Sequence, residues 1–245
     1  MTQDQAKTAV IFGVGPSSGL GAALARRFAR EGLKVTLAAR SGERLAAVAA
    51  EIAARGGTAR ARVADATREQ DVEALFSEAA ADGALDLVVF NAGANYARPA
   101  LELEPEAFEA LWRVNAYGGF LVGREAARRL SAQGRGTLIF TGATASLRAR
   151  PPFLGFAAAK SALRAVAQGL AREFGPKGVH VAHVIVDGVI NGDFARERFP
   201  QFVAAKGEDG LLKPDDVADA YVALWRQKRS AWSHEIDLRP FAEPF

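Results

Sequence analysis

Apolar residues recur along the chain in two alternating patterns, which predict strands and helices in turn. Short runs such as residues 85–90 are apolar on both faces, as is typical of parallel strands covered by helices on each side. Between them lie longer stretches with the helical period. Strands are expected at residues 8–12, 34–39, 58–64, 85–90, 136–141, 179–186 and 232–238. Helices are expected near residues 19–31, 42–54, 68–81, 105–132, 152–174 and 215–227.

This alternation predicts an α/β fold, a doubly wound parallel sheet of about seven strands flanked by helices. The 245 residues show no break in composition, so we expect a single domain over residues 1–245. Residues 187–213 interrupt the rhythm with several glycines around a short helical piece at 193–205. A connection this long usually forms a lid or binding loop, and we expect it to be the substrate loop.

Composition removes several classes of chemistry. Apolar residues make up 49% and charged residues 24% of the chain, as in a globular protein with a sizeable core. No apolar run is long enough to span a bilayer, and residues 1–7 are too polar for a secretory signal, so a cytoplasmic protein without membrane contact is expected. Cysteine is absent and the three His are not spaced as metal ligands, so no metal site is expected.

Arginines cluster at two places, and the net charge is +3. Arg26, Arg27 and Arg30 share one expected helix, and Arg128 and Arg129 share another. A nucleic-acid surface would interleave aromatic residues, which these stretches lack. We interpret both clusters as solvated helix faces and expect no nucleic-acid partner.

A glycine cluster follows the first expected strand. Gly15, Gly19 and Gly21 stand where the chain turns from strand to helix. Glycine lets the backbone turn tightly and approach a pyrophosphate, which the following helix N-terminus binds. Ser17 and Ser18, between these glycines, are interpreted as donors to the phosphates. The motif predicts a dinucleotide site on a Rossmann-type sheet.

The end of the second strand predicts which dinucleotide is bound. A site selective for NAD(H) places Asp or Glu there to accept from the ribose 2′-hydroxyl. This chain has Arg40 instead, whose guanidinium matches a 2′-phosphate in shape and charge. NADP(H) is therefore favoured over NAD(H).

With these residues in place, the whole chain resembles a short-chain dehydrogenase/reductase. Gly15, Gly19 and Gly21 fit the TGxxxGxG spacing of that family, with Val14 in place of Thr. The resemblance implies that Asp65 binds the adenine, that Asn115 ties a water to the active-site lysine, and that Lys160 is this lysine, which binds the nicotinamide ribose. It implies the following cofactor-binding residues: Gly15, Ser17, Ser18, Gly19, Leu20, Gly21, Arg40, Asp65, Ala66, Asn91, Ala92, Gly93, Lys160, Gly188, Val189 and Ile190.

The departures from the family pattern fall on the residues that handle protons. The catalytic tyrosine of the family lies four residues before the lysine, where this chain has Phe156, which has no hydroxyl. The partner serine falls on Ala143, with Thr144 next to it as a substitute. Asp187-Gly188 stands where the family has Pro-Gly. We therefore expect an atypical member of the family.

Three accounts of this loss stay open. Another group supplies the proton, with Tyr96 as the first candidate; bulk water or a pocket acid such as Asp187 suffices; or the protein senses the cofactor without chemistry. We favour an NADP(H)-dependent oxidoreductase acting on a small-molecule carbonyl, alcohol or activated alkene, with Lys160, Asn115, Phe156, Thr144 and Tyr96 as active-site positions. The alternative is a catalytically silent NADP(H)-binding sensor or scaffold.

The helix expected at residues 152–174 also resembles a helix that relatives use for dimer contacts. Phe156, Leu163, Leu170 and Phe174 fall near one stripe of it. By this analogy a homodimer or homotetramer is expected.

Overall fold

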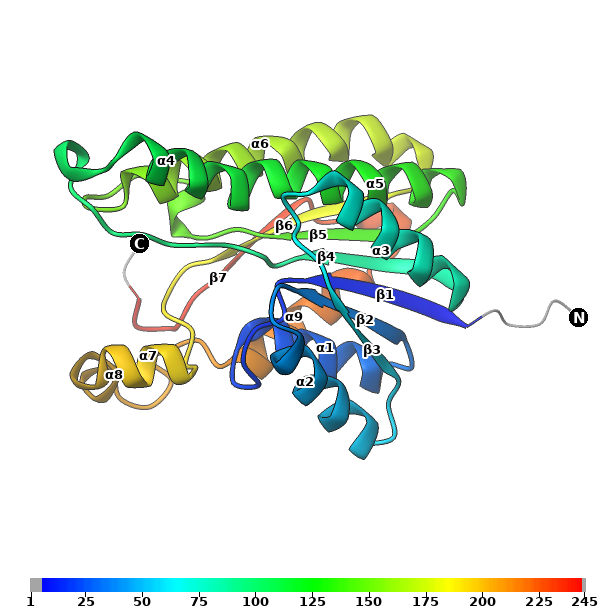
Figure 1. Cartoon of the computed structure of the whole chain (residues 1–245), viewed down its shortest axis with the longest axis horizontal. Helices are drawn as coiled ribbons and strands as arrows, with labels where there is room; N and C mark the ends of the chain where they lie inside the picture. Colours follow the sequence, from blue (N-terminus) through cyan, green and yellow to red (C-terminus); the bar gives the residue numbers. More distant parts are fainter. Residues whose placement is uncertain (1–5, 244–245) are drawn as a thin grey trace, which may run out of the picture.

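One parallel sheet forms the centre of the molecule (Figure 1). The computed structural model describes residues 6–243, so residues 1–5, on which the expectation about a leader largely rests, lie outside it. The strands are β1 (Lys7–Phe12), β2 (Lys34–Ala39), β3 (Ala59–Val63), β4 (Ala84–Phe90), β5 (Thr137–Thr141), β6 (His180–Val186) and β7 (Glu235–Leu238). They pair in the order β3-β2-β1-β4-β5-β6-β7, each with its neighbours in parallel. The predicted doubly wound α/β sheet is confirmed, and its order reverses between β1 and β4, beside which ligands of such sheets bind.

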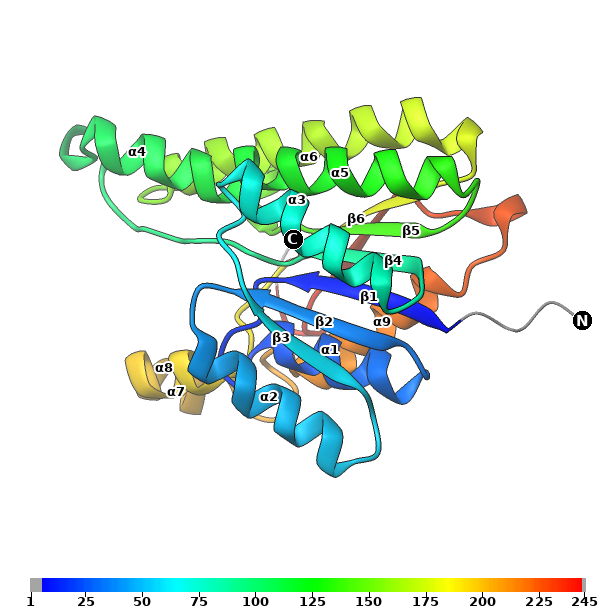
Figure 2. The ribbon, with the colours of Figure 1, turned by 45° about the vertical axis from the view of Figure 1, so that its right-hand side comes forward.

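Helices cover both faces of the sheet. They are α1 (Leu20–Arg30), α2 (Gly42–Ala54), α3 (Glu69–Ala81), α4 (Pro105–Trp112), α5 (Gly118–Ala132), α6 (Leu154–Phe174), α7 (Asp193–Arg198), α8 (Pro200–Lys206) and α9 (Pro214–Trp225). Figures 1 and 2 show α3, α5 and α6 on one face, with α4 extending beyond them, and α1, α2 and α9 on the other. The pair α7 and α8 projects from the edge at which the strands end. None of the described helices is long and apolar enough to cross a membrane.

Two apolar cores hold these layers together. One packs α1, α2 and α9 against the sheet, and the other packs α3, α5 and α6 against its opposite face. Every residue of β4 and β6 is buried, including Asp86, His180 and His183, as is typical of central parallel strands covered on both faces. The edge strand β3 has no fully buried residue.

Two expected helices are interrupted. The helix expected at 105–132 contains a π-helical turn at Arg113–Tyr117, which separates α4 from α5 and carries Asn115. The piece expected at 193–205 is two short helices, because the chain bends at Phe199, directly before Pro200. A residue before proline is disfavoured in helical conformation.

The prediction that the apolar stripe of α6 is free for dimer contacts is wrong. Leu163 is fully buried, and Leu170 and Phe174 pack against the core over the sheet. The exposed face of α6 instead carries small residues, Ala158, Ala165 and Gly169. The apolar stripe was misjudged because α6 uses it to cover the sheet.

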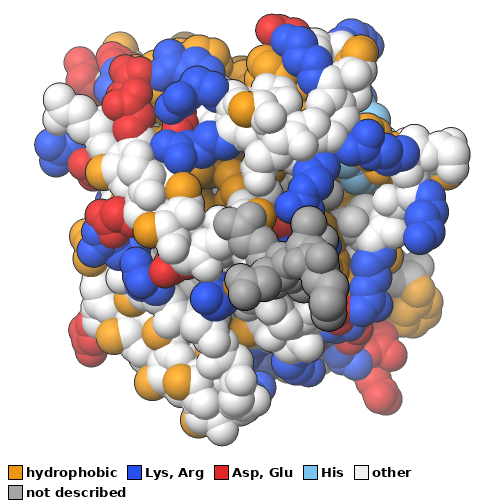
Figure 3. All heavy atoms as spheres, turned by 90° about the vertical axis from the view of Figure 1, so that its right-hand side faces the viewer, with side chains coloured by type: hydrophobic (Ala, Val, Ile, Leu, Met, Phe, Trp, Pro, Cys, Tyr) orange, Lys and Arg blue, Asp and Glu red, His pale blue; other side chains and the backbone are white. Residues whose placement is uncertain are grey.

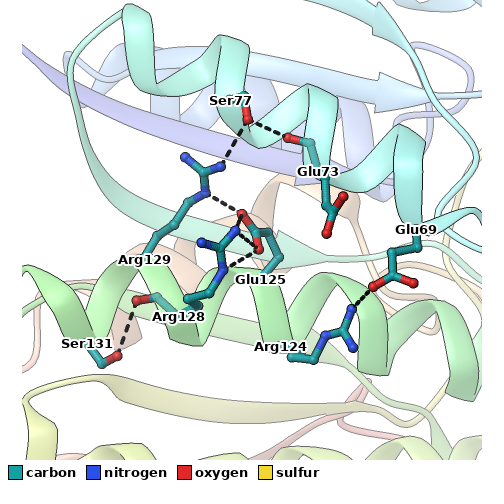
Figure 4. Close-up of polar contacts among 8 residues, drawn as sticks. All are labelled: Glu69, Glu73, Ser77, Arg124, Glu125, Arg128, Arg129 and Ser131. Carbon is teal, nitrogen blue, oxygen red and sulfur yellow. Dashed lines mark hydrogen bonds and ion pairs between the residues drawn. The ribbon is translucent and has the colours of Figure 1, made fainter.

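Lys and Arg side chains are spread over the edge of the molecule at which β1 begins (Figure 3). Most arginines of the two clusters form ion pairs with acidic side chains of the same or a neighbouring helix. On α5, Arg128 and Arg129 both bind Glu125, and Arg129 also donates to Ser77 on α3 over 3.1 Å (Figure 4). Arg124 pairs with Glu69 at the start of α3. This network joins α5 to α3.

Candidate cofactor and active site

Glycines shape the turn from β1 to α1. Gly13 adopts a φ of 87°, and a Cβ there would overlap the backbone of Ala92 after β4. A Cβ at Gly21 would overlap the Gly13 carbonyl, so glycine lets the start of α1 pack on this turn. At Gly15 a Cβ would meet no atom within 4 Å, so the bare backbone faces open space. This is the form of a phosphate-binding turn.

A cleft of about 310 Å³ lies along the carboxyl ends of β1 to β4. Predicted cofactor residues that line it are Gly15, Arg40, Asp65, Ala66, Asn91, Ala92 and Gly93. Predicted residues that do not line it are Ser17, Ser18, Gly19, Leu20, Gly21, Lys160, Gly188, Val189 and Ile190. The cleft therefore collects the residues predicted for the adenosine end.

The two serines of the glycine-rich turn already have partners. The Ser17 hydroxyl and carbonyl accept from Arg26 on α1 over 3.1 and 2.9 Å. The Ser18 hydroxyl accepts from the backbone N–H of Asp193, the first residue of α7, over 3.0 Å. Ser18 thus joins the glycine-rich turn to the segment 187–213, a contact that sequence spacing does not reveal.

Two arginines stand over the cleft at the end of β2. Arg40 is exposed there, and Arg44, one turn into α2, is exposed beside it. Sequence reasoning missed Arg44, although its place four residues after Arg40 on a helix was a usable signal. The position directly after β2, where an acid would accept from a ribose 2′-hydroxyl, holds Arg40.

Asp65 is fixed at the end of β3. Its carboxylate accepts from the backbone N–H and the hydroxyl of Thr67 over 2.9 and 2.8 Å. Burial raises its pKa, but the Thr67 hydrogen bonds and the charges of Arg40 and Arg68 outweigh this, and its pKa is lowered. Asp65 is therefore an ionised acceptor at the cleft.

Lys160 and Asn115 meet in front of Gly93. Lys160 is 5% exposed and donates to the Thr141 carbonyl over 2.8 Å. Burial lowers the pKa of Lys160 to about 8. Asn115 donates to the Ala94 and Leu111 carbonyls, both over 2.9 Å, while its buried Oδ1 has no partner among the described residues. Each polar group keeps hydrogen-bonding capacity for a group that binds at this point.

Phe156 lies one turn before Lys160 on α6, with the ammonium 5.8 Å from its ring centroid. The ring, which has no hydroxyl, stands where the resemblance led us to expect the tyrosine. Thr144, beside Ala143, donates its hydroxyl to Asp187 at the end of β6. Arg148 and Arg239 also bind this buried carboxylate, over 3.2 and 3.1 Å.

Tyr96 lies on the loop after β4. Its hydroxyl accepts from Arg98 over 2.8 Å, and no contact joins it to Lys160 or Asn115 among the described residues. The Arg98 backbone bonds the Pro152 carbonyl over 2.8 Å, which ties this loop to the segment before α6.

Fold and site together define a dinucleotide-binding α/β protein. The sequence matches the short chain dehydrogenase family over residues 7–201. The chain is 41% identical to a short-chain dehydrogenase of Rhodopseudomonas palustris, with a TM-score of 0.83 over 96% of this chain and 99% of that one. A metagenomic short-chain oxidoreductase in complex with NADP is 30% identical, with a TM-score of 0.80 over 96% and 97% of the two chains. A glucose 1-dehydrogenase of Gluconobacter oxydans is 34% identical over 72% of this chain and 67% of its own.

The chain belongs to the short-chain dehydrogenase family, a family of oxidoreductases. Its cofactor class is therefore the nicotinamide dinucleotides, and its glycine turn, paired arginines and under-satisfied Lys160 and Asn115 fit such a group.

Proposed function

We propose that this protein is an NADP(H)-dependent oxidoreductase that acts on a carbonyl, alcohol or activated alkene with an atypical proton-donor arrangement. The observation that carries the proposal is the pairing of Lys160 and Asn115. Both are buried, both face Gly93, and Asn115 Oδ1 has no partner among the described residues. Burying a lysine ammonium with one hydrogen bond is unfavourable, so a site that keeps it is built to receive polar groups.

The preference for NADP(H) rests on Arg40 and Arg44. Both are exposed at the cleft and neither has an ion pair among the described residues, so both are available to a 2′-phosphate. Asp65 is held by Thr67 at the end of the next strand. When bound, NADP(H) supplies or accepts the hydride.

Lys160 is the proposed proton-active residue. A pKa of about 8 lets its ammonium lose and regain a proton near neutral pH, which suits a general acid and base. The proposed role of Phe156 is to pack beside this ammonium as a ring without a hydroxyl.

Thr144 is the proposed substitute for the serine. Because its hydroxyl donates to Asp187, its lone pairs are left to accept from a reacting hydroxyl. Asp187 orients Thr144, and Arg148 and Arg239 bind the carboxylate and hold it in place. Because Thr144 is free to accept and not to donate, this arrangement favours a substrate that presents a hydroxyl group.

The decisive experiment is NADPH binding followed by turnover on the same sample. Binding should be measured by titration, and oxidation of NADPH or reduction of NADP should be followed against a panel of ketones, enones and secondary alcohols. Tyr96→Phe tests the second candidate donor, because loss of most turnover would assign the proton to Tyr96 and not to Lys160. Absence of dinucleotide binding would overturn the proposal.

The alternative function is a catalytically silent NADP(H)-binding sensor or scaffold. It is favoured by one observation, that Phe156 and Ala143 remove both hydroxyls while the arginines and glycines of the cofactor cleft stay. Tight NADPH binding with no turnover over the whole panel would assign this function.

We also propose that the protein forms a homodimer or homotetramer. The outer face of α6 carries the small exposed residues Ala158, Ala165 and Gly169, which allow close helix approach. Trp112 and Phe120, at the junction of α4 and α5, are 41% and 40% exposed. Light scattering on the intact protein and on Ala165→Arg tests this, with a monomeric wild type as the contrary result.

A further inference from the structure

A second cleft, of about 350 Å³, lies between the carboxyl ends of α1 and α2. These helix ends precede β2 and β3, so the cleft is at the edge of the sheet where strands begin, opposite to the cofactor cleft. Figures 1 and 2 show α1 and α2 side by side below the sheet. Arg26, Arg30 and Arg55 line the cleft, together with Ala29 and Ile52.

The charge of this cleft is of one sign. Its lining contains three arginines and no acid. Arg30 and Arg55 are exposed and make no hydrogen bond or ion pair within the described residues. Arg27, between Arg26 and Arg30 on α1, instead pairs with Glu31 and with Asp219 over 2.5 Å. Arg30 is exposed, as expected of a solvated helix face, and with Arg26 and Arg55 it lines one hollow.

Helix-end electrostatics explain only part of this convergence. A cation at the end of a helix is stabilised by the carbonyl ends, which accounts for Arg30 on α1 and Arg55 on α2. Arg26 lies a full turn earlier, and its side chain is only 11% exposed. Arg26 is already paired with Glu51 of α2. Arg30 and Arg55 are left without a counter-charge among the described residues, and an anion bound between them would relieve their repulsion.

The shape adds a second requirement for the ligand. A Cβ at Gly32 or Gly56 would meet no atom within 4 Å, so this part of the lining is bare backbone that faces open space. Ala29 and Ile52 lie beneath this backbone, with exposed fractions of only 8% and 2%. The cofactor cleft resembles this second cleft in two respects. Its volume is similar, about 310 Å³, and it is also lined by glycine backbone and by two arginines without an ion pair among the described residues, Arg40 and Arg44.

We propose that the second cleft is a binding site for an organic phosphate of mononucleotide size, coupled to the cofactor turn through Arg26. The phosphate would lie between Arg30 and Arg55, with its flat ring over the bare backbone of Gly32 and Gly56. Guanidinium groups recognise phosphate oxygens in pairs, and a flat ring needs the uncrowded surface that glycine gives. This site goes beyond the oxidoreductase function and does not depend on it.

Arg26 supplies the coupling. Its guanidinium donates to the Ser17 carbonyl and hydroxyl over 2.9 and 3.1 Å and pairs with Glu51 of α2 over 3.1 Å. One side chain thus joins the phosphate turn, α2 and the second cleft. A phosphate that draws Arg26 toward the cleft weakens its hold on Ser17, so it lowers dinucleotide affinity. By linkage, dinucleotide lowers affinity for the phosphate by the same factor.

The test is a calorimetric titration of AMP into protein saturated with NADPH, so that the cofactor cleft is filled. We expect one equivalent of AMP to bind wild type and the exposed control Arg172→Gln, and at least a tenfold loss of affinity in Arg30→Gln/Arg55→Gln. AMP should also raise the Kd of NADPH several-fold to a plateau, and the plateau should vanish in the double variant. A rise without a plateau reports simple competition at the cofactor cleft and overturns the coupling.

A second protein separates this proposal from the proposed function. Arg40→Gln/Arg44→Gln removes the arginines of the cofactor cleft and leaves the second cleft intact. AMP binding that persists in this variant supports the second site even if NADPH does not bind the wild type. Absence of AMP binding, or equal binding in Arg30→Gln/Arg55→Gln and wild type, overturns the second site.

Discussion

The two ends of the carboxyl edge of the sheet differ in their polar groups. Near β1 to β3, the glycine turn, Arg40 and Asp65 form a cleft with charged and bare-backbone surface. Near β5 and β6, Phe156 and Ala143 offer no hydroxyl, and the polar groups that are present, Thr144 and Asp187, bind each other. Lys160 stands between the two ends. The contrast shows that the charged and bare-backbone surface of one end can stay while the hydroxyl groups of the other end are absent.

The largest effect should follow from restoring the hydroxyls. Phe156→Tyr/Ala143→Ser places a phenol one turn from Lys160 and a serine beside Thr144. We expect turnover of a ketone with NADPH to rise by roughly 10²–10⁴-fold, the usual range of general acid catalysis. Steady-state kinetics on purified wild type and double variant measure it.

The control for this experiment is Phe156→Leu, which changes packing without adding a hydroxyl. A rise in the double variant but not in Phe156→Leu assigns the gain to proton transfer. Unchanged or lower turnover in a folded double variant would show that the bare ring is part of a different active site.

The second prediction concerns the burial of Lys160. Its pKa falls from 10.5 to about 8, and at about 1.4 kcal/mol per unit this difference amounts to about 3 kcal/mol. Between these values the unfolded chain holds a proton that the folded chain has released, so stability rises with pH across this window. The free-energy cost of burying the Lys160 ammonium therefore reduces the stability of the fold in full below pH 8. His183 beside it stays neutral there, since burial lowers its pKa to about 4.

Urea unfolding of wild type and Lys160→Met at about pH 7 and about pH 10 measures this effect. The stability of wild type relative to Lys160→Met should increase with pH by about 2–3 kcal/mol. Lys228→Met, at an exposed position, should show no such change. A constant difference between wild type and Lys160→Met would mean that the ammonium is better solvated than its burial indicates.

Local patterns predicted the fold well, and non-local contacts explain what they missed. The bounds of β2 and α2 agree with the sequence, because each has an unbroken period and a clear boundary residue, such as the Ser41 cap of α2. The π-turn at Arg113–Tyr117 was missed, although the weak helix formers around it, Asn115, Gly118 and Gly119, were a usable signal.

In the candidate site, too, local motifs predicted some residues and non-local contacts explain those that were missed. Arg40, Asp65 and Lys160 follow motifs with fixed spacing, and the structure places each at the carboxyl edge of the sheet. The bond from Thr144 to Asp187 joins residues 43 positions apart, and no spacing rule connects them. The stripe on α6 was misread because periodicity shows that a helix has an apolar face but not what covers it.

The third prediction addresses cofactor choice. In wild type, NADPH should bind more tightly than NADH by about 1.5–3 kcal/mol, as a charge-assisted contact with Arg40 provides. Arg40→Asp should reverse the order, because the carboxylate repels a 2′-phosphate and accepts from a 2′-hydroxyl. Paired titrations of both dinucleotides measure this, and equal affinities in wild type would contradict the assignment.

The smallest expected effect separates Arg44 from Arg40. Arg44 lies on the same side of the cleft but on α2, exposed and without an ion pair among the described residues. A solvent-screened contact of this kind contributes about 0.5–1 kcal/mol, so Arg44→Gln should weaken NADPH two- to fivefold and leave NADH unchanged. Arg172→Gln, equally exposed on α6, should change neither affinity. If Arg44→Gln lowers NADPH affinity as much as Arg40→Gln does, both guanidinium groups bind the 2′-phosphate. If Arg44→Gln lowers NADH affinity by the same factor as NADPH affinity, Arg44 instead contacts the part of the cofactor that the two dinucleotides share.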